Sequence, residues 1–180
     1  MIIALAGRRV DAPNSPTLRF PPENVYRVGE RIKNLFMEKE VTALVSAAAC
    51  GADLIALTVA SDLGLRRRIV LPFKKSRFRE TSVADRPGDW GSIFDNVTAE
   101  VEAVGDLLIL DDVGEDEKAY EATNIAIFDE AKLLSIKTGT PLFAVVVWDG
   151  MSRGQGDLTA SFANEARLRA ILVDEIMTST

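Results

Sequence analysis

The segment Ser46–Asp53 reads Ser-Ala-Ala-Ala-Cys-Gly-Ala-Asp and joins an apolar run to the start of an amphipathic stretch. Small side chains at a strand-to-helix turn let backbone N–H groups approach an anion, and the helix N-terminus adds a partial positive charge. The segment has one glycine and no following lysine, so it is neither a dinucleotide fingerprint nor a P-loop. It predicts either an anion cradle or a tight turn in which Asp53 caps the helix.

Two basic segments follow other apolar runs. Gly7-Arg8-Arg9 leaves the first run, where guanidinium groups can fork onto phosphate oxygens or remain in solvent. Lys74–Arg79 is the most basic stretch of an acidic chain. Its Arg77 and Arg79 are candidate phosphate contacts on a loop that closes over a ligand, with Trp90 covering a base or ribose. The alternative is a solvated loop that Phe78 and Trp90 pin to the core.

Three further groups are candidates for sugar, base or phosphate contacts. Tyr120 and Asn124 stand four residues apart near the start of a long helical pattern, where they either contact the ligand or bond local backbone. Trp148-Asp149-Gly150 offers an indole for stacking and a carboxylate for ribose hydroxyls. Gly154–Thr159 is a second glycine-rich turn before a helix, either an anion cradle or a flexible turn capped by Asp157.

The absence of histidine and the single cysteine limit the possible chemistry. Ser-His and Cys-His nucleophile pairs and histidine-based zinc sites are excluded, and we expect no metal site. Any proton transfer has to use Asp, Glu, Lys, Tyr or Cys50. Cys50 has no histidine partner, so we expect it to be a packing residue. No catalytic residue is identified.

The elements that must position these residues follow from the hydropathy pattern. Six short apolar runs, most of them continuous, predict strands covered on both faces, at Ile2–Ala6, Thr42–Val45, Arg68–Leu71, Leu107–Leu110, Leu142–Val147 and Ala170–Val173. Helical spacing between them predicts helices at Val25–Phe36, Asp53–Leu63, Lys118–Lys137 and Asp157–Leu168. Alternating strands and helices predict a three-layer Rossmann-like α/β domain with a mostly parallel sheet of about six strands.

Two long segments, 7–24 and 72–90, are expected to be loops at the carboxyl ends of strands, where open α/β sheets bind ligands. The chain has 180 residues, which suit one domain over residues 1–180. A net charge of −6 argues against nonspecific nucleic-acid binding. No run is long and apolar enough for a membrane, and a single cysteine suits the reducing cytoplasm, so we expect a cytoplasmic protein without membrane contacts.

Several of these motifs, taken in order, make the chain resemble the SLOG superfamily, a Rossmann-like group that includes DprA DNA-processing proteins and LOG phosphoribohydrolases. The likeness is closest to the ligand-sensing SLOG/TIR-like domains found beside TPR, CHAT or cyclase modules. The motifs that carry it are Ala6–Pro13 with Arg19–Pro22, Ala49–Asp53, Leu71–Phe73 with Trp90, Ala119-Tyr120 with Asn124, and Trp148–Gly150.

The resemblance implies a ligand such as an NAD-derived ADP-ribose species or a signalling nucleotide, and no required cofactor. It also implies that ligand binding is passed on to an effector, in cis or in trans, in bacterial signalling or defence. Arg8 stands where many members have histidine, and Ser46–Ala49 replaces paired glycines. Phe162 takes the place of the glutamate that the LOG enzymes use, which favours binding over turnover.

The sequence is compatible with three functions. The chain could be a nucleotide sensor, or a hydrolase of nucleotide N-glycosidic bonds with Asp149 or Asp157 as its acid–base group. The third function is an assembly module that forms a homo-oligomer and has a vestigial pocket. The expected ligand contacts are Gly7, Arg8, Arg9, Ser46, Ala47, Gly51, Asp53, Arg77, Arg79, Trp90, Tyr120, Asn124, Trp148, Asp149, Gly150, Gly154, Gly156 and Thr159.

Overall fold

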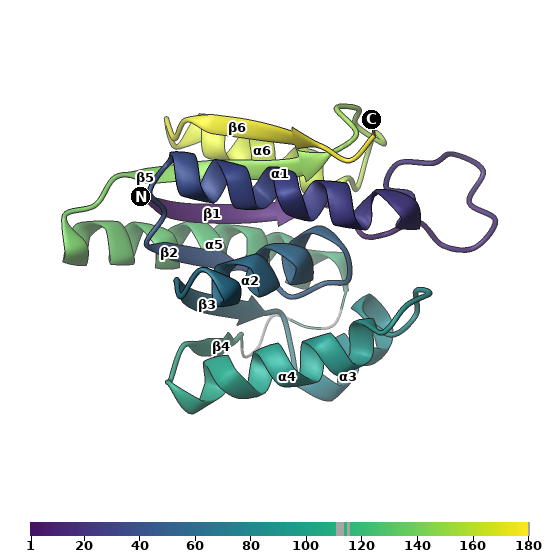
Figure 1. Ribbon diagram of the computed structural model, residues 1–180, viewed down its shortest axis with the longest axis horizontal. Coiled ribbons are helices and arrows are strands. Elements are labelled where there is room, and N and C mark those ends of the chain that lie inside the picture. Colours follow the sequence, from purple (N-terminus) through teal and green to yellow (C-terminus); the bar gives the residue numbers. More distant parts are fainter. Residues whose placement is uncertain (111–113, 115, 180) are drawn as a thin grey trace.

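The computed structural model describes residues 1–110, 114 and 116–179 and contains one all-parallel, six-stranded sheet (Figure 1). The strands lie in the order β4-β3-β2-β1-β5-β6. Their bounds are β1 Ile2–Gly7, β2 Ala43–Ser46, β3 Arg66–Leu71, β4 Leu107–Ile109, β5 Leu142–Trp148 and β6 Val173–Met177. The chain moves outward from β1 to β4, then returns to place β5 against the free side of β1, so the direction of winding reverses between β1 and β5.

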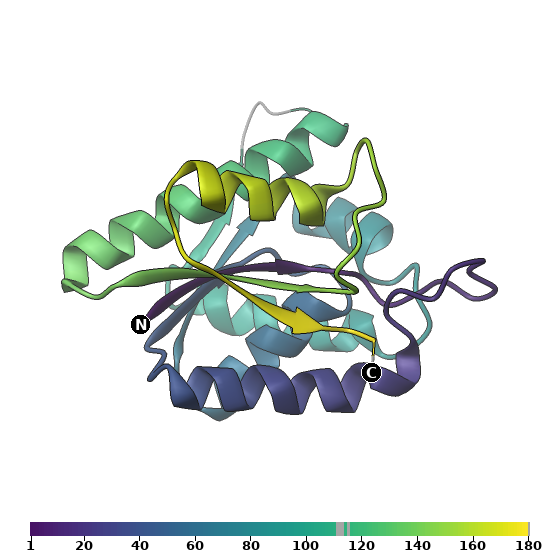
Figure 2. The same ribbon diagram turned by 90° about the horizontal axis from the view of Figure 1, so that it is seen from above.

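Helices cover both faces of this sheet (Figure 2). The helices are η1 Pro22–Asn24, α1 Val25–Glu38, α2 Ala52–Asp62, α3 Lys75–Ser82, α4 Trp90–Ala103, α5 Glu117–Thr138 and α6 Leu158–Leu168. Helices α1, α2 and α4 share one apolar core with the sheet, and α5 and α6 share the other. The predicted three-layer Rossmann-like architecture is therefore confirmed. Among the described residues, no helix has both the length and the hydropathy needed to cross a membrane.

The continuous apolar character of β1 follows from burial on both faces. Ile3 and Leu5 point into the core formed with α1 and α2, whereas Ile2 and Ala4 point into the core formed with α5 and α6. Each of these four side chains is at most 1% exposed. A strand with two buried faces has no polar positions to alternate with, which is why the sequence predicted the central strands correctly.

One of the two expected loops and the last strand differ from the prediction. The segment expected to be a loop over 72–90 contains α3, a mostly polar helix that buries Phe78 and Ser82, and helix α4 follows it. The last strand is not Ala170–Val173 but Val173–Met177. Residues 170 and 171 close the end of α6, because their N–H groups donate to the carbonyls of Arg167 and Ala166. Strand β6 lies at the sheet edge and mixes charged with apolar residues, so a search for continuous apolar runs misplaced it.

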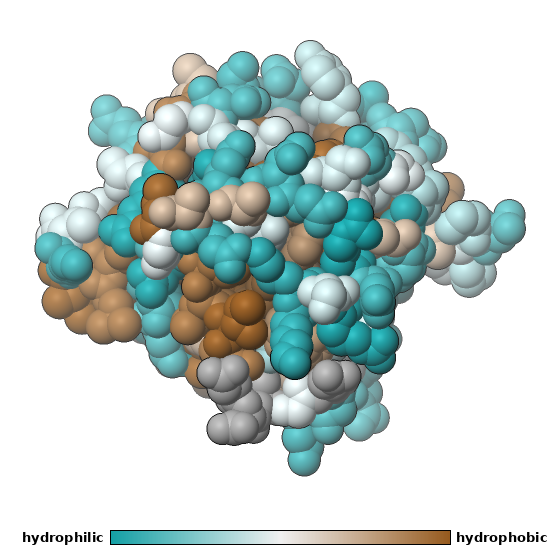
Figure 3. Space-filling model, turned by 90° about the horizontal axis from the view of Figure 1, so that it is seen from below, coloured by the Kyte–Doolittle hydropathy of each residue, from teal (hydrophilic) through white to brown (hydrophobic). Residues whose placement is uncertain are grey.

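The opposite edge of the sheet is apolar. Seen from below in Figure 3, the side of the molecule that carries β4 has a hydrophobic area among hydrophilic side chains. Leu107, Leu108 and Ile109 of this edge strand are each half-buried. Charged side chains nevertheless border β4 and β3, where Arg66 and Arg68 both contact Asp106.

Gly51 provides a test of how tightly the carboxyl edge is packed. Its φ of 94° is unfavourable for other residues, and a Cβ there would lie 2.7 Å from the Val10 nitrogen. We expect Gly51→Ala to lower the free energy of unfolding by about 2 kcal/mol or more. Gly29→Ala within α1 is the control, because the new Cβ would meet only Ile55, at 3.5 Å. This substitution should stabilise the helix by about 0.5–1 kcal/mol. Urea unfolding of both variants measures this, and an unaffected Gly51→Ala would contradict it.

Candidate functional site

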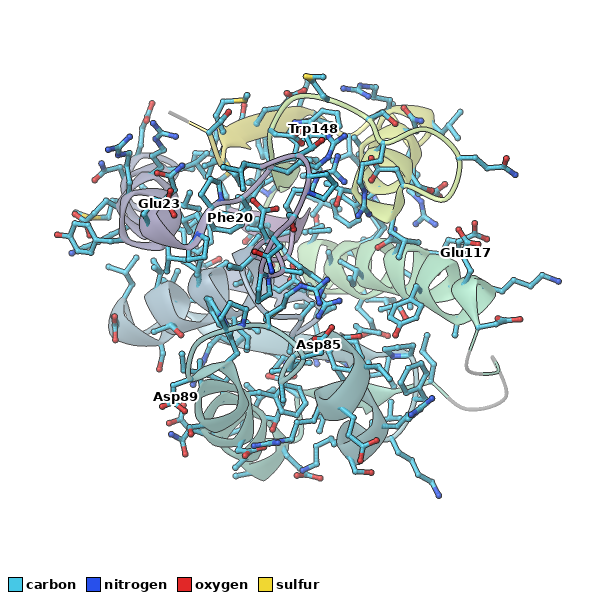
Figure 4. The ribbon with its side chains drawn as sticks, turned by 90° about the vertical axis from the view of Figure 1, so that its right-hand side faces the viewer. Phe20, Glu23, Asp85, Asp89, Glu117 and Trp148 are labelled. Carbon is cyan, nitrogen blue, oxygen red and sulfur yellow. The ribbon has the colours of Figure 1, made fainter. Side chains whose placement is uncertain are left out.

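A cavity of about 590 Å³ opens at the carboxyl edge of the sheet. The strands in Figure 1 point toward this edge, and Figure 4 looks directly onto it. Figure 4 labels residues from separate parts of the chain on this side of the molecule, including Phe20 before η1, Asp85 between α3 and α4, Glu117 at the start of α5 and Trp148 at the end of β5, although these four do not line the cavity. The cavity lies where the winding of the sheet reverses, which is the usual ligand position in open α/β sheets.

Eight of the expected ligand contacts line this cavity. They come from the ends of β1 and β2 and from the N-terminal parts of α2, α5 and α6, and they are Gly7, Arg8, Arg9, Ala47, Asp53, Tyr120, Asn124 and Thr159. The topology thus brings together residues more than 150 positions apart in the sequence.

The Arg8 side chain is buried, and its guanidinium nitrogens are hydrogen-bonded to other protein groups. Its Nε donates to Asp149 at 3.1 Å, and its two terminal nitrogens donate to Asp157 at 2.6 and 2.9 Å. One terminal nitrogen also donates to the Met151 carbonyl at 2.6 Å, and the guanidinium lies over the Trp148 ring. We call this set the Arg8 clamp. It joins the turn after β1 to the turn after β5 and to the start of α6, so Arg8 acts mainly as a structural crosslink.

Asp157 occupies the position in which the sequence predicted a second anion cradle. Its carboxylate accepts hydrogen bonds from the N–H groups of Thr159 and Ala160 at the N-terminus of α6 and from that of Arg153 in the preceding turn. Burial alone would raise the pKa of Asp157, but the hydrogen bonds from Arg8 and these amides hold it well below its usual range. The helix start therefore already contains an anion, and Gly154 and Gly156 line a separate hollow of about 230 Å³ beside Asp157.

The first predicted cradle is also occupied by protein groups. At the start of α2 the Ala52 N–H donates to the Arg8 carbonyl at 3.1 Å, and the Cys50 N–H donates to the Ser82 carbonyl at 3.0 Å. The Ser46 hydroxyl donates to the Leu5 carbonyl. Gly51 is the N-cap, so Asp53 is not the cap that the alternative reading expected. The close approach of the chain to this turn explains its small residues without a bound phosphate.

Asp53 is a buried carboxyl at the cavity wall. Its Oδ2 accepts a hydrogen bond from the Ala49 N–H at 3.2 Å, whereas its Oδ1 is buried without a hydrogen-bond partner among the described residues. Burial raises the pKa of Asp53 to about 7, opposed by the amides of Ala49 and Gly7 and by the charge of Arg9. Asp53 therefore titrates near neutral pH, which is uncommon for a carboxyl group.

Two arginines that line the cavity share a carboxylate partner. Arg9 and Arg86 both contact Asp85, and Arg9 also donates to the Cys50 sulfur at 3.4 Å. Burial raises the pKa of the Cys50 thiol despite the charge of Arg9, which suits the expected packing role. Arg86 further donates to the Val10 carbonyl at 3.1 Å, which fixes the guanidinium at the cavity.

Helix α5 supplies neutral polar groups. The Tyr120 hydroxyl lies 3.1 Å from the Ser82 hydroxyl, and its ring meets the edge of Phe73. The Asn124 amide donates to the Leu158 carbonyl at 3.0 Å, which leaves its side-chain oxygen for other partners. Asn124 thus bonds local backbone, as one of the two alternatives expected, and both side chains also line the cavity.

Other expected contacts lie away from the cavity. Arg79 forms a two-oxygen pair with Asp95 on the outer surface, and Arg77 lies near Glu80 on the same helix. Trp90 is buried in the core and donates to the Pro87 carbonyl. The group Ser46, Gly51, Trp148, Asp149, Gly150, Gly154 and Gly156 shapes the edge without lining the cavity.

The sequence analysis missed several lining residues. Arg19, Arg86 and Arg153 bring guanidinium groups, and Asp11 bonds the N–H groups of Arg19 and Phe20. Arg19 already stood in a motif that carried the family resemblance, so it could have been selected. Arg86 and Arg153 stand in irregular segments without a motif.

The Arg8 clamp predicts a large loss of stability on truncation. Arg8→Ala leaves the buried carboxylates of Asp149 and Asp157 without their main cation, so we expect a loss of about 3–5 kcal/mol in the free energy of unfolding. Arg79→Ala is the matched control: it removes an exposed arginine pair and should leave stability nearly unchanged. Denaturant titration distinguishes the two, and equal small effects would show that Arg8 is not a structural crosslink.

Asp53 predicts a pH-dependent stability. Its folded pKa lies above its unfolded value, so the folded state favours the protonated form, and stability falls as pH rises from about 4 to about 7. Relative to Asp53→Asn, we expect the wild type to lose roughly 4 kcal/mol at most over this range. Unfolding curves of both proteins at pH 5, 6, 7 and 8 measure the difference. A constant difference would contradict the raised pKa.

Comparison with known proteins adds no family assignment. No family model matches the chain, and no curated protein matches it. Within the described part of the chain, no group of three or more Cys, Asp or Glu side chains is placed to hold a metal ion. The chemical interpretation therefore depends on the cavity: five arginines, two aspartates, hydroxyl and amide groups, and an apolar wall that includes Phe78, Ile127 and Leu158.

Proposed function

We propose that this chain binds a small nucleotide-derived phosphate compound in the 590 Å³ cavity and acts as a ligand sensor. The observation that carries the proposal is a cluster of five arginines in the cavity lining. The lining also holds two aspartates, and Asp85, Asp149 and Asp157 pair with the arginines from outside it. The cluster occurs in a chain whose net charge is −6, and guanidinium groups are well suited to bind phosphate.

The arginines share their carboxylate partners, which leaves positive charge for a ligand. Asp85 serves both Arg9 and Arg86, and Asp149 serves both Arg8 and Arg19. Arg19 and Arg9 are only partly buried, with side chains 21% and 29% exposed. Each can therefore turn a free N–H toward a phosphate without leaving its partner, as the five-donor geometry of guanidinium allows.

The remaining lining suits a nucleoside. Cavities of roughly 300–1,000 Å³ accommodate drug-sized ligands, and a nucleotide falls within that class. Pro72, Phe78 and Ile127 provide an apolar wall, while Tyr120 and Asn124 provide hydroxyl and amide groups. An apolar wall with a few convergent polar groups is the usual surrounding of a base and its sugar.

We favour ligand binding over hydrolysis of the ligand, because the two carboxylates considered as acid–base groups are poorly placed for that role. Asp149 and Asp157 both pair with Arg8, and neither lines the cavity. The pKa of Asp157 is held low, so it cannot serve as a proton donor near neutral pH. The resemblance to the SLOG superfamily supports the same choice, because it implies sensing for an effector in cis or in trans.

The segment between β1 and η1 gives the sensor a means of response. Residues 8–21 line much of the cavity and carry Arg9 and Arg19. This segment extends from the body of the molecule at the right of Figure 1. A phosphate bound between it and Arg86 would draw the segment inward, and the changed surface is available to an effector.

Calorimetric titration with AMP, GMP, ADP-ribose and NAD tests the proposal. We expect at least one to bind, and Arg86→Gln to weaken it about tenfold, because a charge-assisted hydrogen bond is lost. Arg79→Gln is the control, since Arg79 lies outside the cavity, and it should leave affinity unchanged. Failure of all four compounds to bind would contradict a nucleotide site, and equal losses in both variants would contradict its location.

A further inference from the structure

Two arginines of the cavity lining are held on the side of β3. Arg9 and Arg86 share the carboxylate of Asp85, in the segment that follows α3. The Nε of Arg86 also donates to the Val10 carbonyl, and the Nε of Arg9 donates to the Cys50 sulfur. One terminal nitrogen of each guanidinium, Nη1 of Arg9 and Nη2 of Arg86, has no hydrogen-bond partner among the described residues. We call these two arginines the β3-side pair.

Two other arginines of the lining are held by the segment that follows β5. The Nη1 of Arg19 donates to Asp149 and to the Met151 carbonyl, whereas its Nε and Nη2 have no partner in the described part of the chain. The Arg153 side chain is 52% exposed, and its nearest carboxylate oxygen, on Asp157, lies 3.9 Å away. We call Arg19 and Arg153 the β5-side pair. Each pair therefore keeps N–H donors that a phosphate can use.

The two pairs are anchored on opposite sides of the cavity. Strands β3 and β5 are separated by β2 and β1, so they lie three strand spacings apart, roughly 14 Å. Figure 4 shows Asp85, which holds the β3-side pair, and Trp148, which precedes Asp149, on opposite sides of this edge. Arg8 does not connect the two pairs, because each of its guanidinium nitrogens is bonded within the Arg8 clamp. The positive charge that a ligand can reach is thus divided between two places.

The lining contributed by α5 is uncharged. This helix packs against β1 and β2, the strands between the two pairs, and it brings Tyr120, Asn124 and Ile127 to the cavity. The two aspartates of the lining, Asp11 and Asp53, accept hydrogen bonds from backbone N–H groups. A ligand with a neutral middle and an anionic group at each end is therefore complementary to the cavity.

We propose that the ligand is a nucleoside that carries two phosphates on separate atoms, so that one phosphate meets the β3-side pair and the other meets the β5-side pair. This inference rests on the proposed function and names its ligand class as nucleoside bisphosphates. A nucleoside monophosphate leaves one pair without an anion. The phosphorus atoms of a pyrophosphate share one bridging oxygen, so they lie too close together to meet both pairs. Free N–H donors on both sides allow each phosphate charge-assisted hydrogen bonds.

Titration calorimetry with adenosine 3′,5′-bisphosphate, AMP and ADP tests the inference. The bisphosphate should bind about tenfold or more tightly than either of the others, because it alone gains charge-assisted hydrogen bonds at both pairs. ADP carries as many phosphates as the bisphosphate, so it controls for the number of charged groups. Binding of AMP or ADP as tight as that of the bisphosphate would overturn the inference while the proposed function stands.

One substitution in each pair locates the two phosphates. Arg86→Gln and Arg153→Gln should each weaken binding of the bisphosphate about tenfold, whereas AMP, with one phosphate, should respond strongly to only one of them. Arg79→Gln is the matched control and should leave all affinities unchanged, because Arg79 lies outside the cavity. Bisphosphate affinity that survives either cavity substitution unchanged would also overturn the inference.

The remaining outcomes separate the inference from the proposed function. If ADP-ribose or NAD binds and the bisphosphate does not, the inference fails and the nucleotide site stands. If no nucleotide binds, both fail. Thermal unfolding shows whether each variant is folded, and should Arg86→Gln not fold, the ranking of the three ligands on the wild type and the effect of Arg153→Gln decide.

Discussion

The carboxyl edge of this protein depends on one buried ion-pair network, the Arg8 clamp. A single guanidinium holds Asp149, Asp157 and the Met151 carbonyl, which belong to the turn after β5 and the start of α6. Parallel sheets bring many chain turns to one edge, where the backbone of each turn is irregular. Arg8 links the turn after β1 to those after β5, and so fixes the wall against which the cavity opens.

The clamp also separates the structural charges from those available to a ligand. Its two carboxylates occupy the position of a bound anion, one of them on the N-terminal amides of α6. Arg9, Arg19, Arg86 and Arg153 remain at the cavity with shared or distant partners. Asp53, the neighbouring carboxyl, lacks a full set of partners and titrates near neutrality. One edge therefore combines a rigid support with a polar and cationic pocket.

Much of the fold was predictable because strands that are buried on both faces have continuous apolar sequences. Runs such as Ile2–Ala6 and Leu142–Val147 have no polar positions, and they form the central strands. Edge strand β6 and helix α3 have mixed sequences, since only part of each is buried, and neither could be placed by the same criterion. Strand β6 acquires its place by pairing with β5.

The site was predictable only as a region. Glycines and small residues at the ends of β1 and β2 indicated the edge correctly, and Asp53, Tyr120 and Asn124 do line the cavity. The interaction partners of each side chain could not be inferred from nearby residues. Arg8, for example, bonds Asp149 and Asp157, which are 141 and 149 positions away in the sequence. Gly51 is small because the backbone of Val10 passes against it, a contact that no local pattern specifies.

The most direct test is a crystal structure of the protein soaked with AMP at neutral pH. The account predicts that the phosphate lies against Arg9, Arg86 or Arg153 and that Arg8 keeps both of its aspartates. Displacement of Asp157 from the α6 N-terminus by the phosphate, or a nucleotide bound outside the cavity, would contradict it.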